Sequence, residues 1–179
     1  RWWWSDSWWN QGKIETAANF DVTTRWVTYK DGDIEVRALL AQPKKRGRYP
    51  GILFVHGRRG LDELVQKKVV RLAARGLIVL APDIYDAHNM EAYPYEHDYA
   101  LEQTVNKGVD ALLGIPGRTN KKICLVSHTR GGYYSLKVAV TKGRQLKDVA
   151  CYVSWYPHMQ DPNAPEPSQV YGYAPEADD

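Results

Sequence analysis

Cysteine and long apolar runs are scarce in this chain of 179 residues. It has two cysteines, Cys124 and Cys151, and no apolar run near the roughly 20 residues that a membrane-spanning helix needs. Two cysteines cannot form the multi-bridge framework of a small secreted domain. Because each stands near the start of an apolar, strand-like segment, we expect two buried thiols that act as small hydrophobic residues. One bridge between neighbouring strands is the alternative.

Neither sign of charge is in large excess in this chain. The formal net charge is +3, hydrophobic residues make up 44% and charged residues 25%, a composition typical of a soluble globular domain. The one basic cluster, KKRGR at 44–48, is short enough to be a solvated loop rather than a nucleic-acid footprint. We therefore expect no nucleic-acid partner and no transmembrane segment.

The two ends of the chain differ in composition from its middle. Residues 1–22 form a Trp-rich N-terminal arm, since the first ten residues hold five of the seven tryptophans. Indole rings anchor interfaces, so we expect this arm to pack on its own domain or to dock onto a partner chain. Residues 158–179 are acidic and Pro-rich and predict an extended tail. The predicted domain is therefore 23–157.

The first residue is Arg1 rather than Met. Two interpretations are open: a leader has been removed, which favours an exported or periplasmic protein, or the sequence starts inside a longer product. No signal-peptide core is present to decide between them.

Strand-like and helix-like segments alternate through the domain. TTRWVTYK and IEVRALLAQP flank a DGD turn and predict a hairpin. Continuous apolar runs predict buried strands at 51–57, 77–83, 121–127 and 149–157, and apolar residues at helical spacing predict helices at 61–76, 99–115 and 131–143. This order predicts an α/β fold with a mostly parallel sheet and helices on both faces.

Function in such sheets sits at the carboxyl ends of the strands. Those ends carry His56-Gly57-Arg58-Arg59, Pro82-Asp83, Ser127-His128-Thr129 and Tyr156-Pro157-His158. The run SHTRGG at 127–132 has the outline of a strand-to-helix catalytic turn, small-x-nucleophile-x-Gly, with a threonine at the nucleophile position. The question is whether the chemistry is present as well as the outline.

The segment GILFVHGRRGLDELVQKKVVRLAARGLIVLAPDIY, followed by SHTRGGYYSL, resembles the dienelactone hydrolase family of the α/β-hydrolase fold. The similarity runs from about Thr24 to Pro157. It implies hydrolysis of an ester or lactone through an acyl-enzyme, with a histidine base and an aspartate later in the chain. By position, Thr129 occupies the nucleophile slot, and the backbone N–H groups of Arg130 and Arg58 occupy the oxyanion positions.

The chain departs from the family pattern in several ways. A branched residue at the elbow, Thr129, is expected either to be strained by about 1–3 kcal/mol or to sit in a relaxed turn. Gly57 stands in the slot of a family glutamate, and Ala87 in that of an arginine that grips substrate. Nothing after Pro157 reads as a strand, so we expect the last strands of the family fold to be missing. His158 is the sole later histidine and a weak base candidate.

The other histidines offer little chemistry. We expect His56 to be structural, beside the oxyanion loop, and His128 to point away from the Thr129 site because side chains alternate along a strand. His88 and His97 flank a Tyr-rich loop that also holds Asp86, Glu96 and Asp98, but their spacing matches no metal-ligand pattern. We predict no metal and no cofactor.

These observations favour a dienelactone hydrolase-like protein that has lost hydrolase activity and serves as an accessory subunit of a larger complex. Its expected partner is another protein chain, bound through the Trp-rich arm and the bare edge of the sheet. The alternative is an active carboxylic ester or lactone hydrolase that uses Thr129, with base and acid supplied by another segment or chain.

Overall fold

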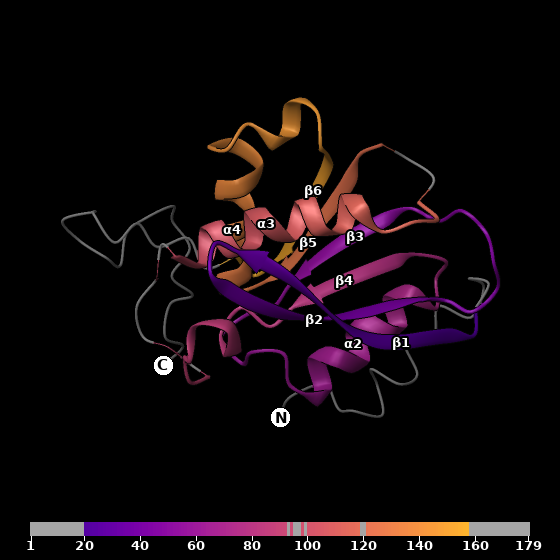
Figure 1. Ribbon diagram of the computed structural model, residues 1–179, viewed down its shortest axis with the longest axis horizontal. Coiled ribbons are helices and arrows are strands. Elements are labelled where there is room, and N and C mark those ends of the chain that lie inside the picture. Colours follow the sequence, from indigo (N-terminus) through magenta and orange to yellow (C-terminus); the bar gives the residue numbers. More distant parts are fainter. Residues whose placement is uncertain (1–19, 93, 95–97, 99, 119–120, 158–179) are drawn as a thin grey trace, which may run out of the picture.

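The computed structural model describes residues 20–92, 94, 98, 100–118 and 121–157. Six strands form one sheet in the order β1-β2-β4-β3-β5-β6, flanked by helices (Figure 1). The elements are β1 (Val22–Asp31), β2 (Ile34–Pro43), β3 (Gly51–Val55), α2 (Glu63–Ala73), β4 (Ile78–Pro82), the 3-10 helix η1 (Asp86–His88), α3 (Ala100–Gly114), β5 (Ile123–His128), α4 (Arg130–Val140), the 3-10 helix η2 (Arg144–Leu146) and β6 (Val149–Trp155).

The sheet is mostly parallel, as the sequence predicts. β1 and β2 form the expected antiparallel hairpin, and Gly32 at φ 58° lies in its turn, a conformation that glycine adopts without strain. β2 is also antiparallel to β4, while the pairs β3–β4, β3–β5 and β5–β6 are parallel. Only β2 therefore runs against the other strands, and the carboxyl ends of β3, β4, β5 and β6 meet at one edge of the sheet.

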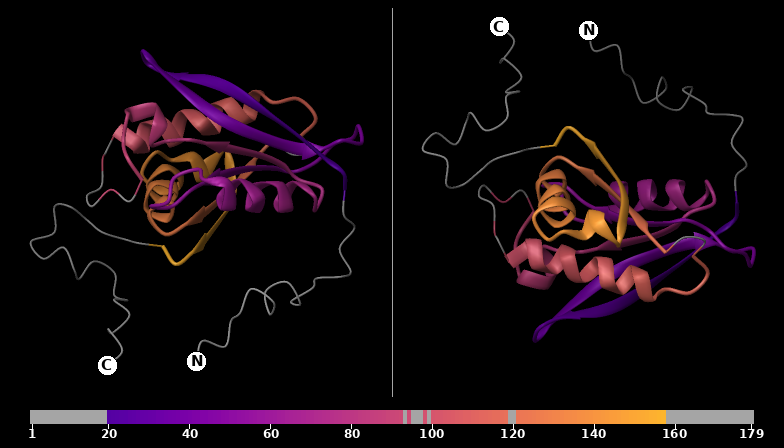
Figure 2. Two further views of the ribbon diagram at one scale, coloured as in Figure 1. Left: turned by 90° about the horizontal axis from the view of Figure 1, so that it is seen from below. Right: turned by 90° about the horizontal axis from the view of Figure 1, so that it is seen from above.

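Helices cover both faces, and each face has its own hydrophobic core. α2 packs on one face, while α3 and α4 lie on the other (Figure 2). Successive residues of β3 divide between the two cores: Leu53 faces α3 and α4, whereas Phe54 faces α2. This alternation explains why β3 is apolar at every position and why it is buried throughout.

Helix α2 has the N-terminal cap and the following glycine that its sequence suggests. The carboxylate of Asp62 accepts a hydrogen bond from the Val65 N–H at 2.9 Å and so caps the helix. Gly76, at φ 85°, follows the helix in the left-handed region. The helix itself stops at Ala73, three residues short of the predicted end, because the last turn leaves the α-helical pattern before the glycine.

The expectation of two buried thiols is wrong. Cys124 and Cys151 form a disulfide, with their Cα atoms 4.7 Å apart. The parallel register pairs the two residues on neighbouring strands, after a bulge between Ile123 and Cys124, so both side chains lie on the same face. Cys151 is exposed rather than buried, because no described helix covers that part of β6.

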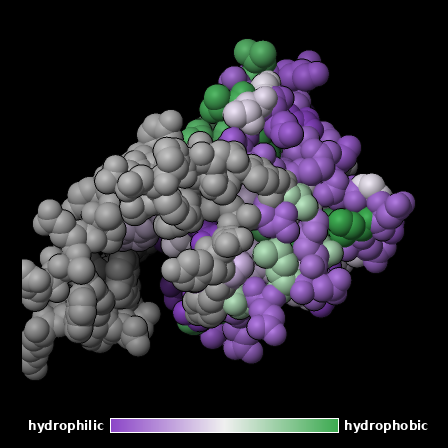
Figure 3. Space-filling view, turned by 90° about the vertical axis from the view of Figure 1, so that its left-hand side faces the viewer, coloured by the Kyte–Doolittle hydropathy of each residue, from purple (hydrophilic) through white to green (hydrophobic). Residues whose placement is uncertain are grey.

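Strand β6 forms one edge of the sheet, and among the described residues no strand follows it. Its end exposes large hydrophobic side chains: Val153 is 43%, Trp155 42% and Tyr156 81% exposed. Other large hydrophobic side chains are exposed elsewhere, at Trp26, Leu64, Val140 and Leu146. The coloured part of the face in Figure 3 is mainly hydrophilic, with a few hydrophobic residues on it. No described helix has the length and apolarity needed to cross a membrane. Residues 1–19 of the Trp-rich arm and all of the 158–179 tail lie outside the described residues.

Candidate functional site

The turn between β5 and α4 has the strained geometry of a nucleophile elbow. Thr129 links the strand to the helix at φ 44° and ψ −118°. Of the two alternatives for this residue, the structure therefore shows the strained one. Two backbone hydrogen bonds hold the conformation: the Thr129 N–H donates to the Trp155 carbonyl at 2.9 Å, and the Thr129 carbonyl accepts from Gly132 at 2.9 Å. A β-branched residue in the left-handed region costs of the order of 1–3 kcal/mol.

Glycines allow the elbow to sit directly on its neighbours. A Cβ atom at Gly131 would overlap with the carbonyl oxygens of Val55 and His56, so the first turn of α4 packs on the end of β3. A Cβ atom at Gly57 would overlap with the Thr129 hydroxyl. The elbow and the β3–α2 loop are therefore in van der Waals contact.

The Thr129 hydroxyl has no chemical activator in the described part of the chain. Its oxygen is buried and makes no hydrogen bond there. His128, the preceding residue in sequence, makes no hydrogen bond to it: the His128 ring stacks on Trp155 at 5.0 Å between centroids and lies 5.4 Å from the Phe54 ring. Burial, followed by the charge of Lys68, lowers the pKa of His128 to about 4, so its imidazole is neutral at physiological pH.

His56 has a structural role. It is 1% exposed, and its Nδ1 lies 2.9 Å from the Gly57 carbonyl oxygen. Because a carbonyl oxygen only accepts hydrogen bonds, Nδ1 carries the proton and donates the hydrogen bond. Its Nε2 accepts a hydrogen bond from the Ile84 N–H at 3.2 Å. Burial lowers the pKa of His56, so the ring is neutral and both nitrogens are engaged. His56 therefore connects the ends of β3 and β4 and is not a base for Thr129.

The sequence analysis assigned a role only to the backbone N–H groups of Arg130 and Arg58. It did not predict that the Arg130 side chain is buried beside the elbow. The Arg130 side chain is buried at 3% exposure and hydrogen bonds the hydroxyl of Tyr134. Burial lowers the pKa of Arg130, and the nearby positive charge of Arg58 adds to the effect. Burial raises the pKa of Tyr134 to about 12, so this phenol stays protonated. A signal for this cluster was present: two arginines follow two adjacent strand ends.

Another His–hydroxyl–carboxylate chain exists but is not a site. The Thr104 hydroxyl donates to Asp31 at 2.7 Å and lies 2.7 Å from His88 Nε2. Thr104 is fully buried, so no substrate reaches it. This chain ties α3 to the hairpin and to η1. His88 thus has a structural partner, whereas His97 and the base candidate His158 lie outside the described residues. No group of three potential metal ligands occurs among the residues that the structure describes.

The mostly parallel sheet, the strained strand-to-helix turn and the loop packed against it define an α/β-hydrolase. A family model described as chlorophyllase matches residues 7–157, which is most of the chain. The chain belongs to that family.

The curated relatives bear out the resemblance to dienelactone hydrolases. The chain is 33% identical over 85 residues to the putative hydrolase fragment YghX of Escherichia coli, covering 46% of this chain and 71% of YghX. It is 25% identical over 132 residues to the uncharacterized peptidase YtmA of Bacillus subtilis, covering 72% of this chain and 49% of YtmA. A putative carboxymethylenebutenolidase of Synechocystis is 27% identical over 82 residues, covering 46% of this chain and 32% of that protein.

Solved structures confirm the fold. The dienelactone hydrolase-like promiscuous phosphotriesterase P91 from metagenomic libraries matches with a TM-score of 0.62 at 21% identity, covering 78% of this chain and 61% of P91. The dienelactone hydrolase from Anabaena variabilis matches with a TM-score of 0.61 at 20% identity, covering 76% of this chain and 64% of that enzyme. The chain thus spans less than two thirds of either structure.

Proposed function

We propose that this chain is a dienelactone hydrolase-like subunit whose elbow is chemically silent and which acts as an accessory component of a larger complex. One observation carries the proposal. The Thr129 hydroxyl is buried at the apex of the elbow, and no described residue accepts its proton. A hydroxyl at its ordinary pKa is a weak nucleophile until a neighbouring base activates it.

The neighbouring histidines support this interpretation because each is committed elsewhere. Both ring nitrogens of His56 are occupied by backbone groups. The ring of His128 is held against Trp155 and Phe54. Asp83 lies 3.7 Å from His56 Nε2, and its carboxylate is therefore directed at a histidine that does not serve Thr129.

The proposed partner is another protein chain that covers the outer edge of β6. Val153 and Trp155 on that strand, and Tyr156 beyond it, are large hydrophobic residues that stay exposed. An uncovered edge strand pairs readily with other polypeptides, so a functional edge is normally covered. The Trp-rich arm at residues 1–22 is the second proposed contact, on the strength of its composition.

The test of the silent elbow is direct. The protein is incubated with a fluorophosphonate probe and assayed for hydrolysis of p-nitrophenyl acetate, beside a bacterial dienelactone hydrolase as positive control. We expect no adduct at Thr129 and turnover no faster than buffer. Stoichiometric labelling of Thr129 in the wild-type chain would overturn the proposal.

The test of the accessory role is association. Size-exclusion chromatography with light scattering, applied to the protein purified from its native source, is expected to give a mass well above that of one chain. Val153→Lys together with Trp155→Lys should reduce the mass, while Leu146→Lys, an exposed residue on η2, should not. A well-behaved monomer from the native source contradicts the accessory role.

One observation favours the alternative of an active ester or lactone hydrolase. The elbow keeps its strained backbone at φ 44°, a conformation with a cost that serves no purpose in a purely structural turn. In that case another segment or chain supplies an imidazole–carboxylate couple to Thr129. Activity that appears only in the native complex and is lost in Thr129→Val would identify this alternative.

A further inference from the structure

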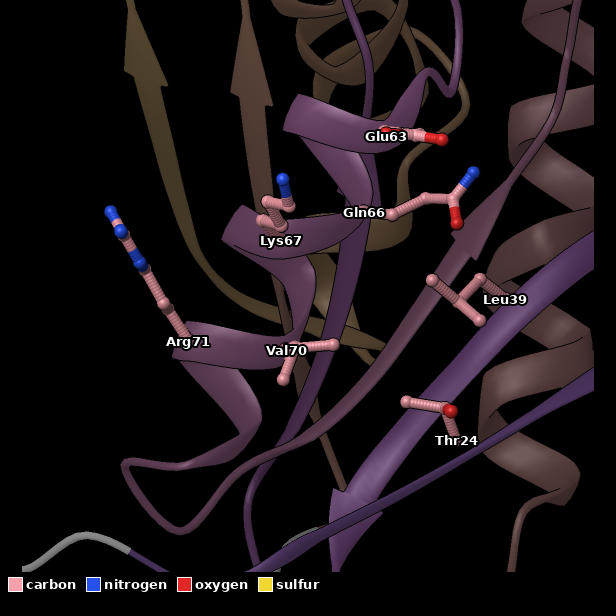
Figure 4. Close-up of a pocket in the computed structure, with 7 residues that line it drawn as sticks. All are labelled: Thr24, Leu39, Glu63, Gln66, Lys67, Val70 and Arg71. Atoms are coloured by element: carbon pink, nitrogen blue, oxygen red, sulfur yellow. The ribbon is translucent and has the colours of Figure 1, made fainter.

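A pocket of about 280 Å³ opens between α2 and the elbow, on the face of the sheet that α2 covers. It is lined by Phe54, His56, Gly57, Arg58, Arg59, Val65, Lys68, His128 and Thr129. A larger hollow of about 560 Å³ lies between α2 and the β1–β2 hairpin (Figure 4). The charges on that hollow have both signs, because Glu63 lines it together with Lys67 and Arg71. Unlike that hollow, the smaller pocket carries charge of one sign and includes the elbow residue Thr129.

Its charge is positive. Three cationic side chains line it, and none of its lining residues is acidic. The positive charge of Arg59 is offset by Asp62, whose carboxylate lies 2.6 Å from the Arg59 guanidinium. Lys68 makes no ion pair or hydrogen bond within the described part of the chain, and its charge reaches the His128 ring. The pocket therefore presents an ammonium group toward any ligand that enters it.

Its inner wall is apolar and aromatic. Phe54 is 1% exposed and Val65 6%, so both are fixed by the α2-side core. The His128 ring also lines the pocket, 5.4 Å from the Phe54 ring and 5.0 Å from the Trp155 ring between centroids. Because this imidazole is neutral above pH of about 4, it offers an aromatic surface and adds no competing charge. A flat ring enclosed by such walls is stabilised by contact with both aliphatic and aromatic carbon.

We infer that this pocket binds a small aromatic carboxylate, with the ring against Phe54, Val65 and His128 and the carboxylate toward Lys68. The volume lies just below the range of typical small-molecule sites, about 300–1,000 Å³, and so suits a single ring with few substituents. An ammonium and a carboxylate at a partly desolvated rim form a charge-assisted hydrogen bond. This binding goes beyond the proposed accessory function and does not require Thr129 to react.

The experiment uses the full chain, with benzoate as the probe, in isothermal titration calorimetry at low salt. Lys68→Gln removes the charge at an exposed helix position, and Lys67→Gln is the matched control one residue away, in the other hollow. Benzamide keeps the ring but lacks the negative charge, and acetate keeps the carboxylate but lacks the ring, so each compound tests one of the two groups. We expect one saturable site for benzoate, binding about tenfold weaker in Lys68→Gln and unchanged in Lys67→Gln.

Benzamide and acetate are each expected to bind at least about tenfold more weakly than benzoate, because each lacks one of the two groups that the pocket recognises. Benzoate should also raise the pKa of His128, followed by NMR of the ring protons, since a nearby anion favours the imidazolium. Lys68 on α2 is the charged side chain that acts on this ring in the free protein. Absence of saturable benzoate binding, equal losses in the two lysine variants, or equal affinity for benzamide each overturn the inference.

Discussion

The hydroxyl of Thr129 occupies the space that a side chain at Gly57 would need. A Cβ atom built on Gly57 overlaps with Thr129 Oγ1 and would stand 3.2 Å from Thr129 Cβ and 3.1 Å from the His128 carbonyl. The end of β3 and the elbow after β5 therefore fit together only with a glycine on one side. A side chain at position 57 would therefore require Thr129 and the His128 carbonyl to shift.

The first prediction concerns this contact. Gly57→Ala should destabilise the protein by about 1–3 kcal/mol, because the added methyl overpacks a buried contact with little room to shift. In a Thr129→Gly background the same change should cost clearly less, since the overlapping hydroxyl is gone. Urea denaturation of the wild type, both single variants and the double variant gives the coupling energy.

Gly114→Ala is the matched control, because a Cβ atom at Gly114 meets nothing within 4 Å. It should leave stability unchanged or slightly increase it, as Gly114 is the last residue of α3. Strictly additive effects of Gly57→Ala and Thr129→Gly would contradict the proposed contact.

The second prediction compares the threonines at the two ends of α4. Thr129→Gly should stabilise the protein by about 1 kcal/mol, because relief of the strain at φ 44° outweighs the entropy cost of a glycine in the unfolded chain. Thr141→Gly should instead destabilise by about 0.5–1 kcal/mol, since Thr141 lies at φ −74° and gains nothing from glycine. Thermal unfolding followed by circular dichroism measures both, and a lower melting temperature for Thr129→Gly would argue against a strained elbow.

The third prediction is that stability falls with acidification. Burial holds the pKa of His128 at about 4, below its ordinary 6.5, and lowers the pKa of His56 as well. Below about pH 6.5 the folded state then binds fewer protons than the unfolded state. The contribution of these histidines to the free energy of unfolding is therefore complete above about pH 6.5, and it is lost as the pH falls toward about 4. Urea midpoints at pH 7.5 and pH 5 should show this loss.

His128→Phe should reduce the dependence on pH while keeping the stack on Trp155, because phenylalanine does not titrate. Lys68→Gln should reduce it less, as Lys68 is the smaller of the two causes that lower the pKa of His128. A slope that is unchanged in His128→Phe would show that the ring does not titrate as described.

The fourth prediction concerns the disulfide between Cys124 and Cys151. It closes a chain segment with a sequence separation of 27, so breaking it should cost about 3–4 kcal/mol through the entropy of the unfolded chain. The doubly substituted Cys124→Ser/Cys151→Ser protein should unfold at lower urea concentration than the oxidised wild type. Dithiothreitol should shift the wild type toward the double variant and leave the variant itself unaffected. Two free thiols in the unreduced protein, counted under denaturing conditions, would contradict the bond.

Much of the fold could be predicted because its signals are local. The apolar runs around Leu53, Leu80 and Leu125 predict buried strands, and the helical spacing of Val65, Val69 and Ala73 predicts α2. The elbow is also local, since the small residues that it needs follow directly in the sequence. The predicted helix ends were less accurate: α2 ends at Ala73, three residues before the glycine at which the sequence predicted its end.

What the chain could determine by itself was the order of its elements and the position of the elbow, because side-chain periodicity and turn residues act over a few neighbours. Only the tertiary structure decided the pairing of Cys124 with Cys151, the burial of the Arg130 side chain and the stacking of His128 on Trp155. The disulfide and the stack depend on the register between β5 and β6, whereas the burial of Arg130 depends on the packing of α4 against the sheet. A shift of one residue in that register would turn Cys151 and Trp155 to the opposite face.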